Sequence, residues 1–241
     1  MTLRRSVPAV VLTAMVLGVG TASARAATTD FVARYDFDGG RSGAIVDESG
    51  NGHVLGQVSS GGGAVRVVAH RSGQALRFPA KCGLKDQSKC PHIALQSPST
   101  ASLNPGTRPL AFGASVLLAE SQTTKGQNIV QKGYSATSSQ WKMQIDGEAG
   151  QPSCVLVGAR PGIKMVRSSV SVTDGHWHTL QCLRRGTQFT IVVDGVVRGN
   201  RTISAELAIS NELPLSIGGK GAFRDNDQFQ GILDDVWVRV G

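Results

Sequence analysis

Alternating apolar and polar positions dominate the second half of the chain. In residues 188–193 large apolar side chains alternate with smaller ones, with the period of two that marks a β-strand whose faces have different surroundings. The pair Asp194-Gly195 follows directly and has the composition of a two-residue hairpin turn, because glycine tolerates the positive φ that such a turn requires. Residues 174–199 therefore predict three consecutive antiparallel strands.

Similar strand-like runs recur along the whole chain, separated by turn residues. They repeat roughly every 8 to 15 residues, and no window shows a helical period for more than a single turn. Many short strands with glycine-rich turns are typical of an all-β sandwich of two antiparallel sheets. The richest Gly/Ser stretch, residues 59–63, is short and lies between two strand-like runs, so it predicts a hairpin tip and not a linker. A single domain is therefore expected.

The N-terminus has the pattern of a secretory leader. Arg4 and Arg5 precede an apolar run over residues 7–19, and small residues follow up to Ala26. The run is shorter than the roughly 20 apolar residues that span a bilayer. The leader, of bacterial type, predicts a signal peptide over residues 1–26, a mature domain over 27–241, and a secreted, extracellular protein.

The charge of the mature chain is mildly positive. Without the three arginines of the leader, 22 basic side chains stand against 17 acidic ones, and the basic residues are dispersed. Nucleic-acid-binding proteins usually concentrate such charge on one face or helix, so no nucleic-acid partner is expected. Solubility, or attraction to anionic wall polymers and acidic glycans, accounts for the excess.

Four cysteines in an exported chain predict two disulfides, out of three possible connectivities. Cys82 and Cys90 lie eight residues apart across a short loop and are expected to pair. Cys154 and Cys182 each lie in a strand-like run, and their hairpin-like spacing suggests a bridge between adjacent strands. No Cys-x-x-Cys is present, which argues against a zinc site.

The segment from Asp174 resembles a signature of laminin G-like domains in the concanavalin A-like lectin and glucanase superfamily. It reads Asp-Gly-His-Trp-His-Thr-Leu and is followed, across one strand, by Val-Asp-Gly at residues 193–195. Other matches occur in the right order, so the resemblance covers residues 31–241: they lie at residues 35–39, 47–52, 73–78, 129–133, 217–219 and 229–236. The resemblance implies a jelly roll of two curved antiparallel sheets, whose concave face relatives use for ligands. It also implies that the Trp-His pair is a structural landmark, with Trp177 in the core.

Alternation assigns faces in two strands that bear candidate ligand-binding residues. In residues 140–145 the apolar positions are expected in the core, which leaves Gln140, Lys142 and Gln144 on the solvent side. In the last strand three valines share one face, and Trp237 and Arg239 share the other. These five polar or aromatic residues are the predicted ligand-binding set.

Catalytic equipment is not evident. The glucanase branch of the superfamily supplies its carboxylates from one strand in a Glu-x-Asp-x-x-Glu pattern, which this chain lacks. Its glutamates lie mostly in or beside turn-like segments, and no two have same-face strand spacing: they are Glu48, Glu120, Glu148, Glu206 and Glu212. We therefore expect a protein that is not an enzyme.

A structural calcium ion is the inorganic partner that the resemblance implies. In related jelly rolls an ion often ties the first strand to the last, and the matching positions here are Asp234, Asp36, Asp38 and Gly73. Carboxylates and backbone carbonyls are the oxygen ligands that calcium takes. Alternatively, Asp234 pairs with a neighbouring amide or arginine.

The function expected first is a secreted, monomeric, non-catalytic recognition module that binds an extracellular carbohydrate or glycoconjugate weakly. The second is an extracellular scaffold domain that contacts protein or cell-wall partners through its loops, and the third is a glycan-active enzyme. The first rests on analogy of fold, since only 5% of the chain is aromatic and lectin-like sites usually stack sugars on exposed aromatics.

Overall fold

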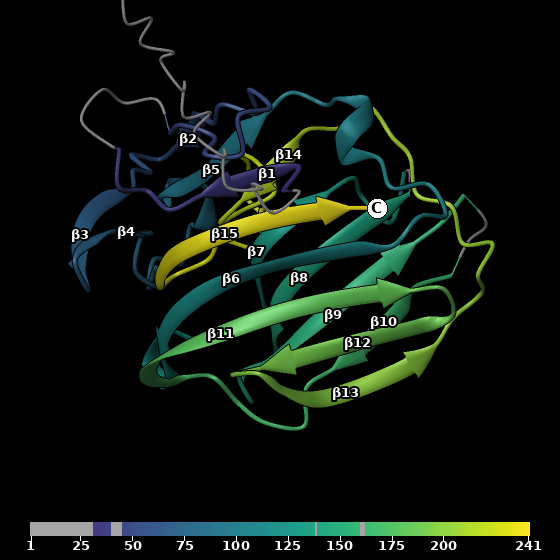
Figure 1. Cartoon of the computed structure of the whole chain (residues 1–241). Coiled ribbons are helices and arrows are strands. Elements are labelled where there is room, and N and C mark those ends of the chain that lie inside the picture. Colours follow the sequence, from purple (N-terminus) through teal and green to yellow (C-terminus); the bar gives the residue numbers. More distant parts are fainter. Residues whose placement is uncertain (1–30, 40–44, 138, 160–161) are drawn as a thin grey trace, which may run out of the picture.

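The computed structural model describes residues 31–39, 45–137, 139–159 and 162–241, and the predicted signal peptide lies outside these residues. The described chain forms two antiparallel sheets packed face to face (Figure 1). This confirms the all-β sandwich that alternation predicted, with the architecture of a concanavalin A-like jelly roll. Among the described residues, no helix has the length and apolar character needed to cross a membrane.

The first sheet contains eight strands. Its order is β13 (Val196–Thr202), β12 (Gln188–Val193), β11 (Asp174–Arg185), β6 (Leu110–Ala119), β15 (Ile232–Val240), β4 (Gly73–Arg77) and β3 (Arg66–His70), and β1 (Ala33–Tyr35) also pairs with β15. The three strands predicted over residues 174–199 are thus confirmed as β11, β12 and β13. Positive φ values of 52° at Asp194 and 76° at Gly195 give the tight turn that their composition predicted.

The second sheet contains seven strands and lies behind the first in Figure 1. Its order is β10 (Lys164–Arg167), β9 (Gln151–Val157), β8 (Gln140–Asp146), β7 (Gly126–Lys132), β14 (Leu215–Ile217), β5 (His92–Ser97) and β2 (Gly56–Ser60). Three single-turn 3-10 helices lie in the connections: η1 (Gln87–Lys89), η2 (Ala101–Leu103) and η3 (Glu120–Gln122).

The core lies between the two sheets and follows the predicted alternation. Trp141, Met143 and Ile145 of β8 are fully buried there, and Trp141 packs against Phe112 of β6 with ring centroids 4.9 Å apart. In β15 a bulge between Asp234 and Trp237 inserts an extra residue, and Val236 and Val238 face the core as predicted.

Both predicted disulfides are confirmed, with one correction. Cys82 bonds Cys90, and Cys154 bonds Cys182. The expectation that the second bridge joins adjacent strands was wrong, because Cys154 lies in β9 and Cys182 in β11, which belong to different sheets. The chain passes through β10 at the edge of one sheet before crossing to the other, so the bridge spans the core, where both residues are fully buried.

Candidate functional site

The outer face of the seven-stranded sheet carries a row of polar side chains. Strand register places Gln96 of β5 beside Ser216 of β14, Ser216 beside Gln131 of β7, and Gln131 beside Lys142 of β8. Their neighbours along each strand fill the core, so these residues point outward. Lys142 is nevertheless only 7% exposed and Gln131 only 1%, which means that other parts of the chain cover this face.

Two loops provide the cover. One is the β7–β8 connection, residues 133–139, and the other is the β14–β15 connection, residues 218–231. The Tyr134 hydroxyl donates to the backbone oxygen of Lys220 at 2.8 Å, and the Gln96 amide donates to the same oxygen at 3.1 Å. The two loops are therefore tied to each other and to the sheet beneath them.

Glycine at position 133 lets the first loop curl over the sheet. Gly133 has a φ of 87°, in the left-handed region that favours glycine, and a Cβ there would collide with the backbone oxygen of Ser139. The resulting turn brings the Gly133 oxygen within 2.9 Å of the Gln140 amide, which donates to it. Gln140 is therefore held in one orientation at the edge of the covered face.

The second loop is fixed by its own polar contacts. The Lys220 amide donates to the Asn226 oxygen at 2.8 Å, and the Asn226 side chain donates to the Gly221 oxygen at 2.8 Å. Ser60 of β2 donates to the Ala222 oxygen at 2.6 Å. This framework presents Phe223 to solvent with 49% of its surface exposed.

A pocket of about 380 Å³, which we call the β8 pocket, lies between the two loops. Gln140 and Lys142 of β8 line it, together with Phe223 from the second loop and a segment of the first. The complete lining is Tyr134, Ser135, Ala136, Thr137, Gln140, Lys142, Lys220, Phe223 and Asp225. The pocket thus combines an exposed aromatic ring with amide, hydroxyl, ammonium and carboxylate groups.

A shared carboxylate controls the charge beside this pocket. Oδ2 of Asp227 lies 3.1 Å from Nζ of Lys142 and 2.6 Å from Nζ of Lys220. Burial lowers the pKa of Lys142, while the Asp227 carboxylate acts in the opposite direction and favours the charged ammonium. Two lysines around one carboxylate leave hydrogen-bond donors facing the pocket at fixed positions.

The structure brings together only part of the predicted ligand-binding set. Gln140 and Lys142 line the β8 pocket, but the expectation that they face open solvent was wrong, because the two loops cover them. Gln144 lies on the same face, where its amide donates to Asp146 at 2.7 Å, and it does not line the pocket.

Trp237 and Arg239 lie on the opposite side of the sandwich, on the outer face of the eight-stranded sheet. Trp237 is half-buried over Gly113, which has no room for a Cβ beneath the indole. The Arg239 guanidinium lies 4.1 Å from the centroid of Phe31 and 5.2 Å from that of Trp237. Both residues line a groove of about 490 Å³, which is separate from the β8 pocket.

Of the predicted calcium ligands, the structure places Asp38 against Gly73, and it pairs Asp234 with His70, which lies opposite Gly73 in the β3–β4 hairpin. Oδ2 of Asp234 lies 2.5 Å from Nδ1 of His70. The Asp38 carboxylate accepts from the backbone N–H of Gln74 at 2.6 Å, and the Asp36 carboxylate accepts from the backbone N–H of Asp38 at 3.2 Å. Asp38 also fills the space that a side chain at Gly73 would need. Within the described residues no three His, Cys, Asp or Glu side chains are placed to hold a metal. Calcium stays a prediction of the sequence.

The Trp-His segment differs from expectation in the position of Trp177. Trp177 is half-buried on the outer face and stacks on His70, with centroids 3.8 Å apart, so placing it in the core was wrong. His178 contacts Asp194 at 2.7 Å and Asp174 at 3.0 Å, and no serine or cysteine side chain of the described chain hydrogen-bonds to its ring.

Glycoside hydrolysis needs an acid and a base or nucleophile flanking one bond, so the placement of the carboxylates bears on it. All five glutamates are exposed in turns, in a bend or in a 3-10 helix. The carboxylates nearest the β8 pocket are Asp225 and Asp227, and Asp227 is held between two lysines.

The sequence did not anticipate the lining residues of the β8 pocket outside β8, among them Tyr134, Lys220 and Phe223. All three lie in loops, where no periodicity indicates which way a side chain points. The one signal was Phe223 itself, an aromatic residue in the glycine-rich segment 218–228, where no strand needs it for a core.

Comparisons with known proteins agree with this architecture. No curated protein matches the sequence. Among solved structures, domain 4 of AbnA, an extracellular GH43 arabinanase from Geobacillus stearothermophilus, in complex with arabinotriose, is similar with a TM-score of 0.65 and 15% identity, covering 88% of this chain and 93% of that one.

Toxin binding domains are similar as well. The binding domain of Paraclostridial Mosquitocidal Protein 1 has a TM-score of 0.65 at 15% identity, and that of Botulinum Neurotoxin DC in complex with SialylT has 0.61 at 8%. Each alignment covers 87% of this chain. It covers only 48% of the mosquitocidal protein's chain and 47% of the neurotoxin's chain, so this chain spans about half the length of either. Identities this low show the fold alone. Residues 92–239 match a laminin G family model described as the concanavalin A-like lectin/glucanases superfamily, and the chain belongs to that family.

Proposed function

We propose that this protein is a secreted, non-catalytic recognition module that binds a short extracellular oligosaccharide in the β8 pocket. The observation that carries the proposal is Phe223, an exposed aromatic ring held by a fixed loop beside a polar floor. Sugar rings present an apolar face of C–H groups and a rim of hydroxyls. Ligand sites commonly pair an apolar surface with a few fixed polar groups in this way.

Each group has a role in this proposal. Phe223 stacks against one face of a sugar ring and excludes water from it. Gln140 and Lys142 make hydrogen bonds with hydroxyl groups, and their orientations are set beforehand by Gly133 and Asp227. Groups that are already ordered lose little conformational entropy when a ligand binds. One aromatic ring gives modest apolar contact, so we expect weak binding, with dissociation constants of about 0.1 to 1 mM, or roughly 4 to 5.5 kcal/mol.

The structural neighbours support a glycan as the class of ligand. The arabinanase domain was solved in complex with arabinotriose, and the neurotoxin binding domain with SialylT. Arabinotriose is therefore the first probe, followed by neutral trisaccharides of glucose, galactose and xylose. Both disulfides are compatible with export to an oxidising compartment.

Calorimetric titration of the protein without its leader tests the proposal. We expect one of these trisaccharides to bind, Phe223→Ala to weaken its binding about tenfold, and Gln140→Ala to weaken it less. Leu84→Ala is the matched control, because Leu84 is similarly exposed, at 52%, and does not line the pocket.

Other results would point elsewhere. Equal binding by the wild type and Phe223→Ala would place the ligand outside the β8 pocket. Absence of binding to every glycan at millimolar concentration, together with retention of an envelope protein that glycan competitors do not displace, would favour the scaffold function. Turnover of a β-glucan by protein free of contaminating hydrolase would establish an enzyme.

A further inference from the structure

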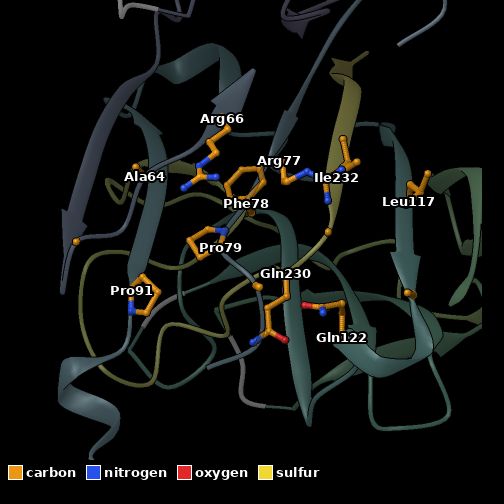
Figure 2. A pocket seen from close by; sticks show the side chains of 14 residues that line it. Ala64, Arg66, Arg77, Phe78, Pro79, Pro91, Leu117, Gln122, Gln230 and Ile232 are labelled. Carbon is orange, nitrogen blue, oxygen red and sulfur yellow. The ribbon is translucent and has the colours of Figure 1, made fainter. Parts of the chain in front are cut away.

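Another cavity, of about 520 Å³, lies at the edge of the eight-stranded sheet, and two arginine side chains line it. Figure 2 shows Arg66 and Arg77 with Phe78 and Ile232 at one end of the cavity, and Pro91, Gln122 and Gln230 towards the other. Pro79, Pro91, Leu117 and Ile232 give it apolar surface, and no acidic side chain lines it.

The arginines are direct cross-strand partners. In the antiparallel pair of β3 and β4, Arg66 lies opposite Arg77, and Arg77 in turn lies beside Ile232 of β15. Leu76 of the neighbouring position faces the core, so both arginines project from the outer face of the sheet. Like charges placed directly opposite each other in a sheet destabilise it, so the fold by itself does not explain this pair.

Within the described chain, no carboxylate relieves the repulsion. Arg71 reaches Asp235 at 3.8 Å and Arg167 reaches Asp146 at 3.4 Å, whereas neither Arg66 nor Arg77 takes part in an ion pair or a side-chain hydrogen bond. The Gln230 side chain adds a further unused group, since its buried Oε1 has no partner among the described residues. The charge of the cavity is therefore positive and uncompensated.

We propose that this cavity is an anion-binding site, separate from the β8 pocket, for a carboxylate or sulfate group carried on a sugar ring. Two guanidinium groups provide paired N–H donors that match the oxygens of such a group. The apolar residues that line the same cavity, Phe78 and Ile232 among them, suit the C–H face of the ring. Its volume is within the range of pockets that enclose small ligands. The inference does not rest on the proposed function, because it uses another cavity on the other sheet.

Titration of the protein without its leader with three probes tests the inference: trigalacturonate, a sulfated chondroitin disaccharide and neutral cellotriose. We expect at least one acidic probe to bind. Its affinity should fall as the salt concentration is raised, because salt screens the attraction between the exposed arginines and the acidic group. Arg66→Gln with Arg77→Gln should weaken that binding at least about tenfold, and the single variants by less. Arg185→Gln removes the same charge from another part of the eight-stranded sheet and should leave binding unchanged.

Unfolding temperatures separate a binding defect from misfolding. Removal of the like-charge pair should leave the unfolding temperature of the double variant equal to or above that of the wild type. Phe223→Ala should not alter binding of the acidic probe, which keeps this test independent of the β8 pocket. The inference is overturned if neither acidic probe binds at millimolar concentration and low salt, or if the double variant binds as tightly as the wild type.

Discussion

Nδ1 of His70 lies 2.5 Å from Oδ2 of Asp234, and the same imidazole ring stacks on Trp177. Both members of the pair are buried, with 9% and 8% of their surfaces exposed. The contact joins the β3–β4 hairpin to β15, and the stacking joins it to β11. His70 thus ties together three strands that the chain order places far apart.

Asp234→Ala should destabilise the fold, because it leaves the buried His70 ring without its partner. A buried polar group that loses its hydrogen bond costs about 1 to 3 kcal/mol in the free energy of unfolding. Urea denaturation at pH 7 measures this difference. Asp225→Asn, in an exposed loop position, is the control and should change the free energy by less than about 0.5 kcal/mol. Equal stability of Asp234→Ala and the wild type would show that the His70 contact contributes nothing.

The calcium prediction has a direct test at the same residue. If an ion takes Asp234 as a ligand, we expect the unfolding temperature to be higher in calcium than in chelator. A ligand that binds the native state alone raises stability with its concentration above the dissociation constant. Asp234→Asn should therefore remove most of that rise, and identical unfolding temperatures of the wild type in calcium and in chelator would contradict the calcium site.

The pH dependence of stability should report on His178. Burial would lower the pKa of His178, but its hydrogen bonds to Asp194 and Asp174 outweigh burial and raise it. The raised pKa adds stability that is fully present below the unfolded value of about 6.5 and is lost as pH rises through the folded value. The wild type should therefore exceed His178→Gln in stability more at pH 5.5 than at pH 8.5, as measured by urea denaturation.

The dependence of stability on pH at the acid end should report on Asp174. A backbone hydrogen bond from His176, followed by the contact with His178, lowers the pKa of Asp174 to about 2. This stabilisation is present above the unfolded pKa of about 3.9 and is lost as pH falls through the folded value. His176→Gln is the comparison: its ring also lies 3.4 Å from Asp174 but is 82% exposed, so it should change the pH dependence less than His178→Gln. A stability difference for His178→Gln that stays constant between pH 5.5 and 8.5 would contradict the prediction.

The two disulfides should contribute unequally. Cys154 and Cys182 are separated by 28 residues and Cys82 and Cys90 by 8, so the first bridge restricts the unfolded chain more. Replacing both cysteines by alanine should cost about 3.5 kcal/mol for the first bridge and about 2.5 kcal/mol for the second. Denaturant unfolding of the two double variants measures the difference. A larger loss from the 82–90 bridge would show that chain entropy is not the dominant contribution.

Parts of the candidate sites were accessible from the sequence and parts were not. Alternation placed Gln140 and Lys142 on the face opposite Trp141, because side-chain direction in a strand is a local property of the backbone. It could not show that residues 133–139 and 218–231 cover that face. The opposition of Arg66 and Arg77 depends on the register between two strands, and the uncompensated charge depends on which carboxylates lie near.

The sequence by itself determined the strands, the turn at Asp194-Gly195 and the sandwich class, and its spacing suggested the pairing of the four cysteines. These follow from the period of two, from the φ that glycine allows and from spacing along the chain, all of which act over a few residues or through simple counts. Only the tertiary structure decided that the bond between Cys154 and Cys182 crosses from one sheet to the other, that His70 holds Asp234, and that Phe223 stands over the floor of the β8 pocket. Those relationships join residues that are distant in the chain, and packing of the whole domain sets them.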